Sequence, residues 1–84
     1  MNGCLFICRS ATYAQKMKNA LLQAGIEAKI VRPNLRLTDG ECGYAVKISD
    51  VFLAEALEIL KRKRIEPMRI LVSDANQQYR EMKQ

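Results

Sequence analysis

The stretch Cys4-Leu5-Phe6-Ile7-Cys8, followed by Arg9 and Ser10, decides how the chain begins to fold. A short run of apolar residues that includes an aromatic one is typical of a strand buried on both faces. Ser10 then offers a side chain that caps helices well. Behind it, apolar residues recur at the spacing of one buried helical stripe: Ala14, Met17, Leu21 and Ala24. Gly25 is a typical helix end, so the chain opens with a strand and a helix.

The same order recurs in the rest of the chain. Residues 27–32 alternate polar and apolar side chains as a half-exposed strand does, and Pro33 stops them. Residues 43–48 predict a third strand, and residues 68–72 a fourth. Between these two strands, Asp50 is expected to cap a second helix. Its buried side would carry Leu53, Ala56, Leu57 and Leu60.

This element order predicts an α+β fold of the ferredoxin-like β-α-β-β-α-β type. We expect a four-stranded antiparallel sheet with two helices on one face. Residues 1–74 would form this single domain, because a chain of 84 residues has room for only one core. Residues 75–84 are mostly polar, but three of them have helical spacing, so we expect a C-terminal tail or a short docked helix.

Composition narrows the class of protein. The sequence shows no signal peptide and no apolar run long enough to span a membrane, so we expect a cytoplasmic protein without membrane contact. Three cysteines at irregular spacing match no disulfide framework and predict free thiols. Without histidine or a Cys-x-x-Cys pair, neither a metal site nor a cofactor is expected.

The net charge of +5 favours acidic partners, RNA or anionic small molecules, without choosing among them. Residues 61–64, Lys-Arg-Lys-Arg, contribute much of this excess. The simplest interpretation of this run is a solvated helix end whose cations complement the helix dipole.

Cys42 is the leading candidate for chemistry, because it lies in the polar, turn-rich stretch 38–43 rather than in a predicted core element. In the predicted topology the third strand lies between the first and second strands, which brings Cys8, Ser10 and Cys42 to one edge. A helix amino terminus and nearby arginines favour a thiolate there and would also hold an anionic ligand. The residues expected to bind substrate beside Cys42 are Gly43, Ser10, Arg9, Arg32 and Arg36, and Arg64 would approach the same edge.

Each of these residues also has a structural interpretation. Gly43 would let a second molecule approach the sulfur of Cys42 closely, or would serve only a loop turn. Cys4 and Cys8 share one face of a central strand and are interpreted first as small apolar core residues. Cys8 ends its strand, so a role as a resolving thiol for Cys42 stays open.

The chain resembles a family of small bacterial domains described as putative selenium/sulfur carrier proteins. The resemblance covers roughly residues 4 to 72 and rests on Leu5-Phe6-Ile7 with Ser10, the segment 21–26, Pro33, and Cys42-Gly43 leading into residues 44–46. It implies that Cys42 is the carrier cysteine, a role closer to a carrier protein than to an enzyme. It also implies a desulfurase-type donor of sulfur or selenium and an acceptor protein.

Two alternatives remain. Leu5-Phe6-Ile7 and residues 43–46 are similar to the two short motifs of RNA-recognition domains. The alternation of side chains along the third strand argues against RNA binding, because Tyr44 and Lys47 must lie on opposite faces of the sheet. If Tyr44 stacked a base on the open face, Lys47 would point into the core. The other alternative is a ligand-sensing or assembly module. It would pair as a homodimer, or be covered by the tail, through an apolar patch of Leu5, Ile7, Ala45 and Leu71.

Overall fold

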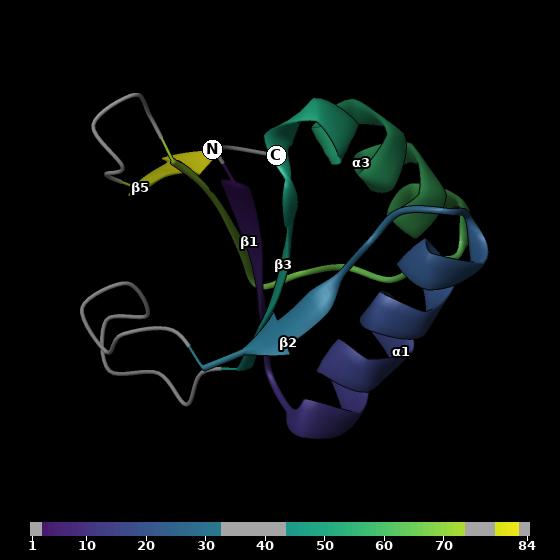
Figure 1. Ribbon diagram of the computed structural model, residues 1–84. Helices are drawn as coiled ribbons and strands as arrows, with labels where there is room; N and C mark the ends of the chain where they lie inside the picture. The colour runs from purple at the N-terminus through teal and green to yellow at the C-terminus, as the bar shows by residue number, and fades with distance from the viewer. Residues whose placement is uncertain (1–2, 33–43, 74–78, 83–84) are drawn as a thin grey trace.

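The computed structural model describes residues 3–32, 44–73 and 79–82 of the chain. These form, in order, β1 (Gly3–Cys8), α1 (Ala11–Gln23), β2 (Lys29–Val31), β3 (Tyr44–Ser49), a 3-10 turn η1 (Asp50–Phe52), α3 (Leu53–Arg62), β4 (Arg69–Ser73) and β5 (Tyr79–Met82) (Figure 1). Apart from η1, the elements from β1 to α3 follow the predicted order of strand, helix, two strands and helix.

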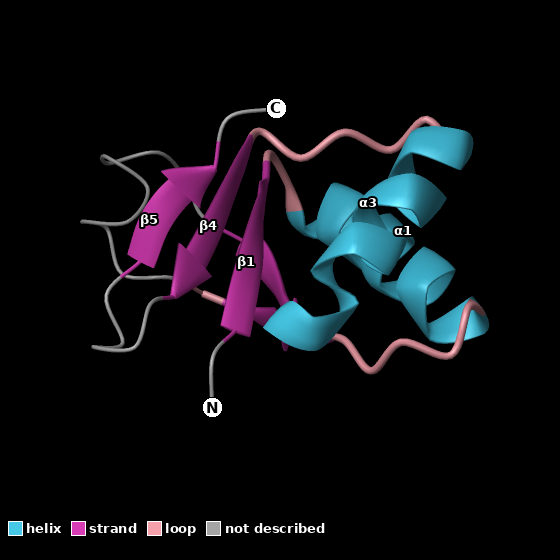
Figure 2. Cartoon of the chain, turned by 90° about the horizontal axis from the view of Figure 1, so that it is seen from above, coloured by secondary structure: helices cyan, strands magenta, loops and turns pink. Residues whose placement is uncertain are grey.

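The strands form one antiparallel sheet in the order β2-β3-β1-β4-β5. Both α-helices cover the same face of this sheet, as Figure 2 shows. The α+β class and the position of β3 between β1 and β2 are therefore confirmed. The predicted four-stranded ferredoxin-like sheet is wrong in its strand number, because a fifth strand extends it beyond β4.

The fifth strand comes from the segment that we predicted as a tail or a short helix. Residues 79–82 pair antiparallel with β4, with Tyr79 opposite Ser73. The Nε atom of Arg69 also donates to a carboxylate oxygen of Glu81 over 2.5 Å. Without β5, β4 would leave a row of backbone N–H and C=O groups unpaired at the sheet edge. Pairing these groups outweighs the helical spacing of a few apolar residues.

The two helices begin differently. Ser10 caps α1 as predicted, because its Oγ accepts a hydrogen bond from the backbone N–H of Tyr13 over 3.1 Å. The predicted cap by Asp50 is wrong. Asp50 instead opens the 3-10 turn, where its backbone carbonyl accepts from the N–H of Leu53, and no side chain caps α3. The 3-10 turn thus provides a backbone acceptor for an N–H group at the start of α3, which a side-chain cap would otherwise have to provide.

Both helices end in the same hydrogen-bonded motif. The N–H of Ile26 donates to the carbonyl of Leu21, and the N–H of Ile65 to that of Leu60, each over 2.9 Å. This motif needs a left-handed residue just before the isoleucine. Gly25 takes that position after α1 with a φ of 85°, whereas Arg64 takes it after α3 with a φ of 56°. Glycine adopts such a φ freely, so the second helix end carries backbone strain that the first does not.

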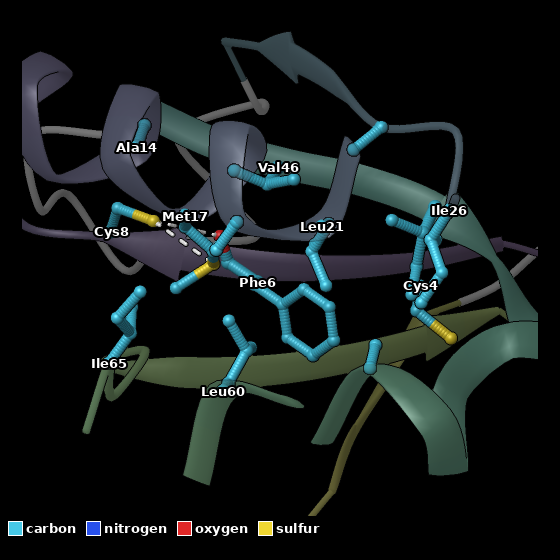
Figure 3. Packing of buried hydrophobic residues seen from close by; sticks show 14 of the residues in the cluster. Cys4, Phe6, Cys8, Ala14, Met17, Leu21, Ile26, Val46, Leu60 and Ile65 are labelled. Carbon is cyan, nitrogen blue, oxygen red and sulfur yellow. Dashed lines mark hydrogen bonds between the residues drawn. The ribbon is translucent and has the colours of Figure 1, made fainter. Parts of the chain in front are cut away.

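The hydrophobic core has two parts, one on each face of β1. Between the sheet and the helices, the ring of Phe6 is fully buried among side chains of β3, β4 and both helices (Figure 3). A smaller cluster lies on the opposite face. We call it the outer cluster, and it consists of Leu5, Ile7, Ala45 and Leu71, with Val31 and Tyr79 packed against it. Because β1 is buried on both faces, its continuous apolar sequence is explained.

Candidate functional site

The end of the sheet where β1 stops and α1 starts brings together several predicted site residues. Cys8, the last residue of β1, lies directly opposite Tyr44, the first residue of β3. Arg9 and Ser10 lead from Cys8 into α1, and Arg32 follows the last residue of β2. We call this region the thiol end. It lies at the lower side of the view in Figure 1.

The two described arginines of the thiol end are each held against a tyrosine ring. The guanidinium carbon of Arg9 lies 5.7 Å from the ring centroid of Tyr13, and that of Arg32 lies 5.2 Å from that of Tyr44. Both distances are within the range of cation–π attraction. Stacking fixes the guanidinium plane and leaves its N–H edge available to an anion. Both arginines are exposed, so a ligand can reach them.

Sequence reasoning missed the two tyrosines. Arg9 and Tyr13 are four residues apart around the first turn of α1, a spacing at which side chains meet. The contact between them could therefore have been predicted from the sequence. Arg32 directly follows β2 and Tyr44 begins β3, and only the pairing of β2 with β3 brings them together. Tyr13 has a further contact, because its hydroxyl oxygen accepts a hydrogen bond from the backbone N–H of Glu66 over 2.6 Å.

That hydrogen bond ties the segment after α3 to the first turn of α1. The N–H of Met68 likewise donates to the carbonyl of Ile7 over 2.7 Å. The chain that follows Arg64 therefore returns to the thiol end, as the predicted topology requires. Arg64 itself is exposed at the turn after α3. Its approach to Arg9 stays a prediction.

The amino terminus of α1 adds positive potential to the thiol end. The first turn of the helix contains no acidic residue that would offset the positive end of the helix dipole. Ser10 occupies one N–H group through its hydroxyl, and other first-turn N–H groups of a helix have no intrahelical acceptor. Together with Arg9 and Arg32, this arrangement favours negative charge at the thiol end.

The two described cysteines are fully buried in the helix-side core. Burial raises the pKa of the Cys8 thiol from 9.0 to about 11. Burial, and to a smaller extent the carboxylate of Asp50, raises the pKa of Cys4 to about 11. The Cys8 sulfur lies 3.4 Å from the carbonyl oxygen of Phe6 and 3.8 Å from the sulfur of Met17 (Figure 3). Both thiols are therefore protonated and shielded at neutral pH, as expected of core residues.

Three predicted site residues lie outside the described residues: Cys42, Gly43 and Arg36. Their assignment to the site stays a prediction, and so does the role of Cys8 as a resolving thiol. Of the predicted set, the structure brings Cys8, Arg9, Ser10 and Arg32 to one end of the sheet.

The two aromatic residues on which the RNA-binding alternative depends do not lie on the outer face of the sheet. Phe6 is fully buried beneath the helices, and Tyr44 packs against the same helix-side core. Lys47 is exposed on the other face, between the buried Val46 and Ile48. The parity argument from the sequence is thus confirmed. Base stacking needs accessible rings on the open sheet face. Phe6 is fully buried, and the half-buried ring of Tyr44 lies on the helix side with Arg32 stacked on it.

The assembly alternative also loses its main support. The four residues of the predicted apolar patch do share one face, as expected. Each is buried within the single chain, however, with at most 4% of its surface exposed. Tyr79 of β5 packs against them, so the C-terminal segment contributes to their cover. A second chain is not needed to explain this patch.

Two further observations concern the described part of the chain. No group of three histidine, cysteine, aspartate or glutamate side chains gathers there as metal ligands would. Neither of the described helices has the length and apolar character needed to cross a membrane.

Comparison with known proteins identifies one family. A family model described as "Putative Se/S carrier protein-like" matches residues 3–72, which run from the first residue of β1 almost to the end of β4. The match includes the whole thiol end and Cys42, whereas β5 follows it. Neither the curated proteins nor the solved structures contain a match to the chain.

Proposed function

The chain belongs to the family described as putative Se/S carrier protein-like, and on that premise we propose that Cys42 carries sulfur or selenium. The cargo would be held as a persulfide or perselenide, received from a desulfurase-type donor and passed to an acceptor protein. We further propose a cytoplasmic setting, where a reducing environment keeps unloaded thiols free.

The observation that carries this proposal is the state of the other two cysteines. Cys4 and Cys8 are fully buried and have a pKa of about 11, which makes them poor nucleophiles at neutral pH. Cys42 is the third cysteine of the chain and falls within the family match. It precedes Tyr44 by two residues, and two peptide units span about 7 Å at most, so the thiol end is within its reach.

The charges of the thiol end support a thiolate and an anionic ligand. Arg9, Arg32 and the amino terminus of α1 all favour negative charge, while Asp39 and Glu41 in the sequence before Cys42 oppose it. We propose that Arg36 and Gly43 complete the site, with Gly43 leaving room for the donor group to approach the sulfur.

The proposed transfer is a thiol exchange that balances without an oxidant. The Cys42 thiolate attacks the terminal sulfur of the donor persulfide, the donor S–S bond breaks, and the donor cysteine leaves as a thiolate. A new S–S bond then joins Cys42 to the transferred sulfur. An acceptor thiolate repeats the attack on that terminal sulfur and regenerates Cys42. A perselenide follows the same steps with an S–Se bond.

Cys8 would have a different role. As a resolving thiol, it would attack the inner sulfur of a Cys42 persulfide, form a Cys8–Cys42 disulfide and release hydrosulfide. Its burial and high pKa make this step slow at neutral pH, which would protect the cargo.

Sulfur transfer to the reduced protein tests the proposal. The protein is incubated with a small-molecule persulfide, and its intact mass is measured before and after reduction. We expect a gain of one sulfur atom that reduction removes and that peptide mapping assigns to Cys42. The Cys42→Ser variant should gain nothing, whereas the double variant Cys4→Ala/Cys8→Ala should behave as the natural chain does. Sulfur mapped to Cys4 or Cys8 in the natural chain would overturn the proposal.

A parallel titration with single-stranded RNA tests the alternative. The carrier account predicts no tight binding, because the two candidate stacking rings face the helices. Tight RNA binding that survives alkylation of Cys42, combined with no sulfur transfer, would replace the carrier account with a nucleic-acid function.

A further inference from the structure

A cavity of about 290 Å³ opens at the end of the sheet opposite the thiol end, where β1 begins and β3 finishes. Gly3 and Ser49 lie opposite each other in the β1–β3 ladder, which ends with Cys8 opposite Tyr44. At about 3.4 Å per residue, Gly3 and Cys8 are roughly 17 Å apart along β1. Any ligand in this cavity is therefore remote from the thiol end.

Two lysines line the cavity from neighbouring strands. Lys29 of β2 lies directly opposite Lys47 of β3, and both side chains are exposed. Directly opposite residues on one face have their Cβ atoms about 5 Å apart, so these two like charges repel each other. Among the described residues, neither lysine forms an ion pair, although Glu27 also lines the cavity. The two lysines and the one carboxylate thus give the described lining of the cavity a net positive charge.

The floor of the cavity is shaped by Gly3. The Cε atom of Lys47 lies 3.4 Å from the position that a Cβ atom on Gly3 would occupy. A Cβ atom on Gly3 would thus be in ordinary van der Waals contact with the end of the Lys47 side chain, which lies over this position. The N–H of Gly3 already donates to the hydroxyl of Ser73 over 2.8 Å. Among the described lining residues, the side-chain donors for a ligand are the two ammonium groups and the hydroxyl of Ser49.

We propose that this cavity is a second anion site, which binds a small, multiply charged anion of the phosphate type between Lys29 and Lys47. A phosphate oxygen accepts a charge-assisted hydrogen bond from each ammonium group, and its negative charge removes their mutual repulsion. Ser49 adds a neutral donor at the end of β3. This site is independent of the proposed carrier function, because it uses no residue of the thiol end and no cysteine.

Amide NMR spectra of the intact protein, recorded during titration with sodium phosphate, test the proposal. Sodium chloride keeps the ionic strength constant, so that general screening does not contribute. We expect saturable shifts at the amides of Gly3, Lys29, Lys47 and Ser49. Lys47→Gln and Lys29→Gln should each weaken phosphate binding about tenfold, the loss typical of one charge-assisted hydrogen bond. Lys16→Gln removes the same charge from the exposed side of α1 and should leave the affinity unchanged.

Three results would overturn the proposal. Phosphate that shifts none of these four amides shows that the cavity does not bind it. Equal weakening by Lys16→Gln and Lys47→Gln shows a response to net charge alone. Shifts confined to Ser10 and its neighbours place the phosphate at the thiol end and show that this cavity is not its site, while they leave the proposed carrier function intact. Thermal unfolding of each variant, expected to match the natural chain, verifies that the fold is intact.

Discussion

Differential reactivity of the three thiols follows directly from the burial of two of them. Consider alkylation of the natural chain with iodoacetamide at neutral pH. Cys4 and Cys8 have a pKa of about 11 instead of 9.0, and a difference of two pH units lowers their thiolate fraction about 100-fold. Both side chains are also fully shielded from the reagent. We therefore expect Cys42, even with an ordinary pKa, to react at least about 100 times faster than either of them.

The assay is a time course of alkylation followed by peptide mass spectrometry, which gives a separate rate for each cysteine. A matched time course in concentrated denaturant supplies the control, because unfolding removes the burial that distinguishes the thiols and their rates should converge. Native labelling of Cys8 within tenfold of the rate of Cys42 would refute the reasoning. It would mean that the end of β1 opens readily, and that the raised pKa does not describe the working state of the protein.

Other predictions concern stability and are measured by urea unfolding followed by circular dichroism. Arg64→Gly should stabilise the chain by about 0.5–1 kcal/mol, because the relief of about 1–2 kcal/mol of left-handed strain exceeds the entropy that glycine adds to the unfolded state. Arg64→Ala keeps the strain and should not stabilise the chain. Equal effects of the two changes would refute this reasoning. Leu60→Ala should lower the free energy of unfolding by about 2–5 kcal/mol by opening a core cavity, whereas Cys42→Ser should lower it by less than about 0.5 kcal/mol. Similar losses in the two variants would show that the sulfur of Cys42 has a structural role. The free energy of unfolding should fall as the pH rises from about 9 to 11, by up to about 2–3 kcal/mol for each buried thiol, because the unfolded chain releases these protons first. Cys8→Ala should flatten this dependence, and an unchanged slope would contradict the assigned pKa.

Local sequence signals predicted the elements that local interactions determine. The cap of α1 needs only Ser10 and the backbone three residues later, and the structure shows that hydrogen bond. The burial of β1 on both faces follows from its continuous apolar sequence. Successive side chains of a strand point to opposite faces of the sheet, so the sequence also predicts that Val46 of β3 is buried and Lys47 is exposed.

The Asp50 cap failed although it is a local feature, because a 3-10 turn takes its place. The other predictions that failed depend on interactions between distant segments. Residues 79–82 have no strong preference of their own and become a strand only because β4 offers unpaired backbone groups. The outer cluster was correctly listed from the sequence, but its burial depends on segments brought from elsewhere, including Tyr79. At the candidate site, the arginines were predicted from charge, whereas the stacking of Arg32 on Tyr44 required the strand pairing.

The most direct test of the carrier function is the intact mass of the protein purified from cells, measured before and after reduction and followed by peptide mapping. The account predicts a fraction of molecules heavier by one sulfur or selenium atom, with the extra atom on Cys42 and lost on reduction. Cys42→Ser, purified in the same way, should lack this species. A natural chain that carries no added sulfur or selenium under conditions in which its donor is active, or that carries it on Cys4 or Cys8, would contradict the central claim.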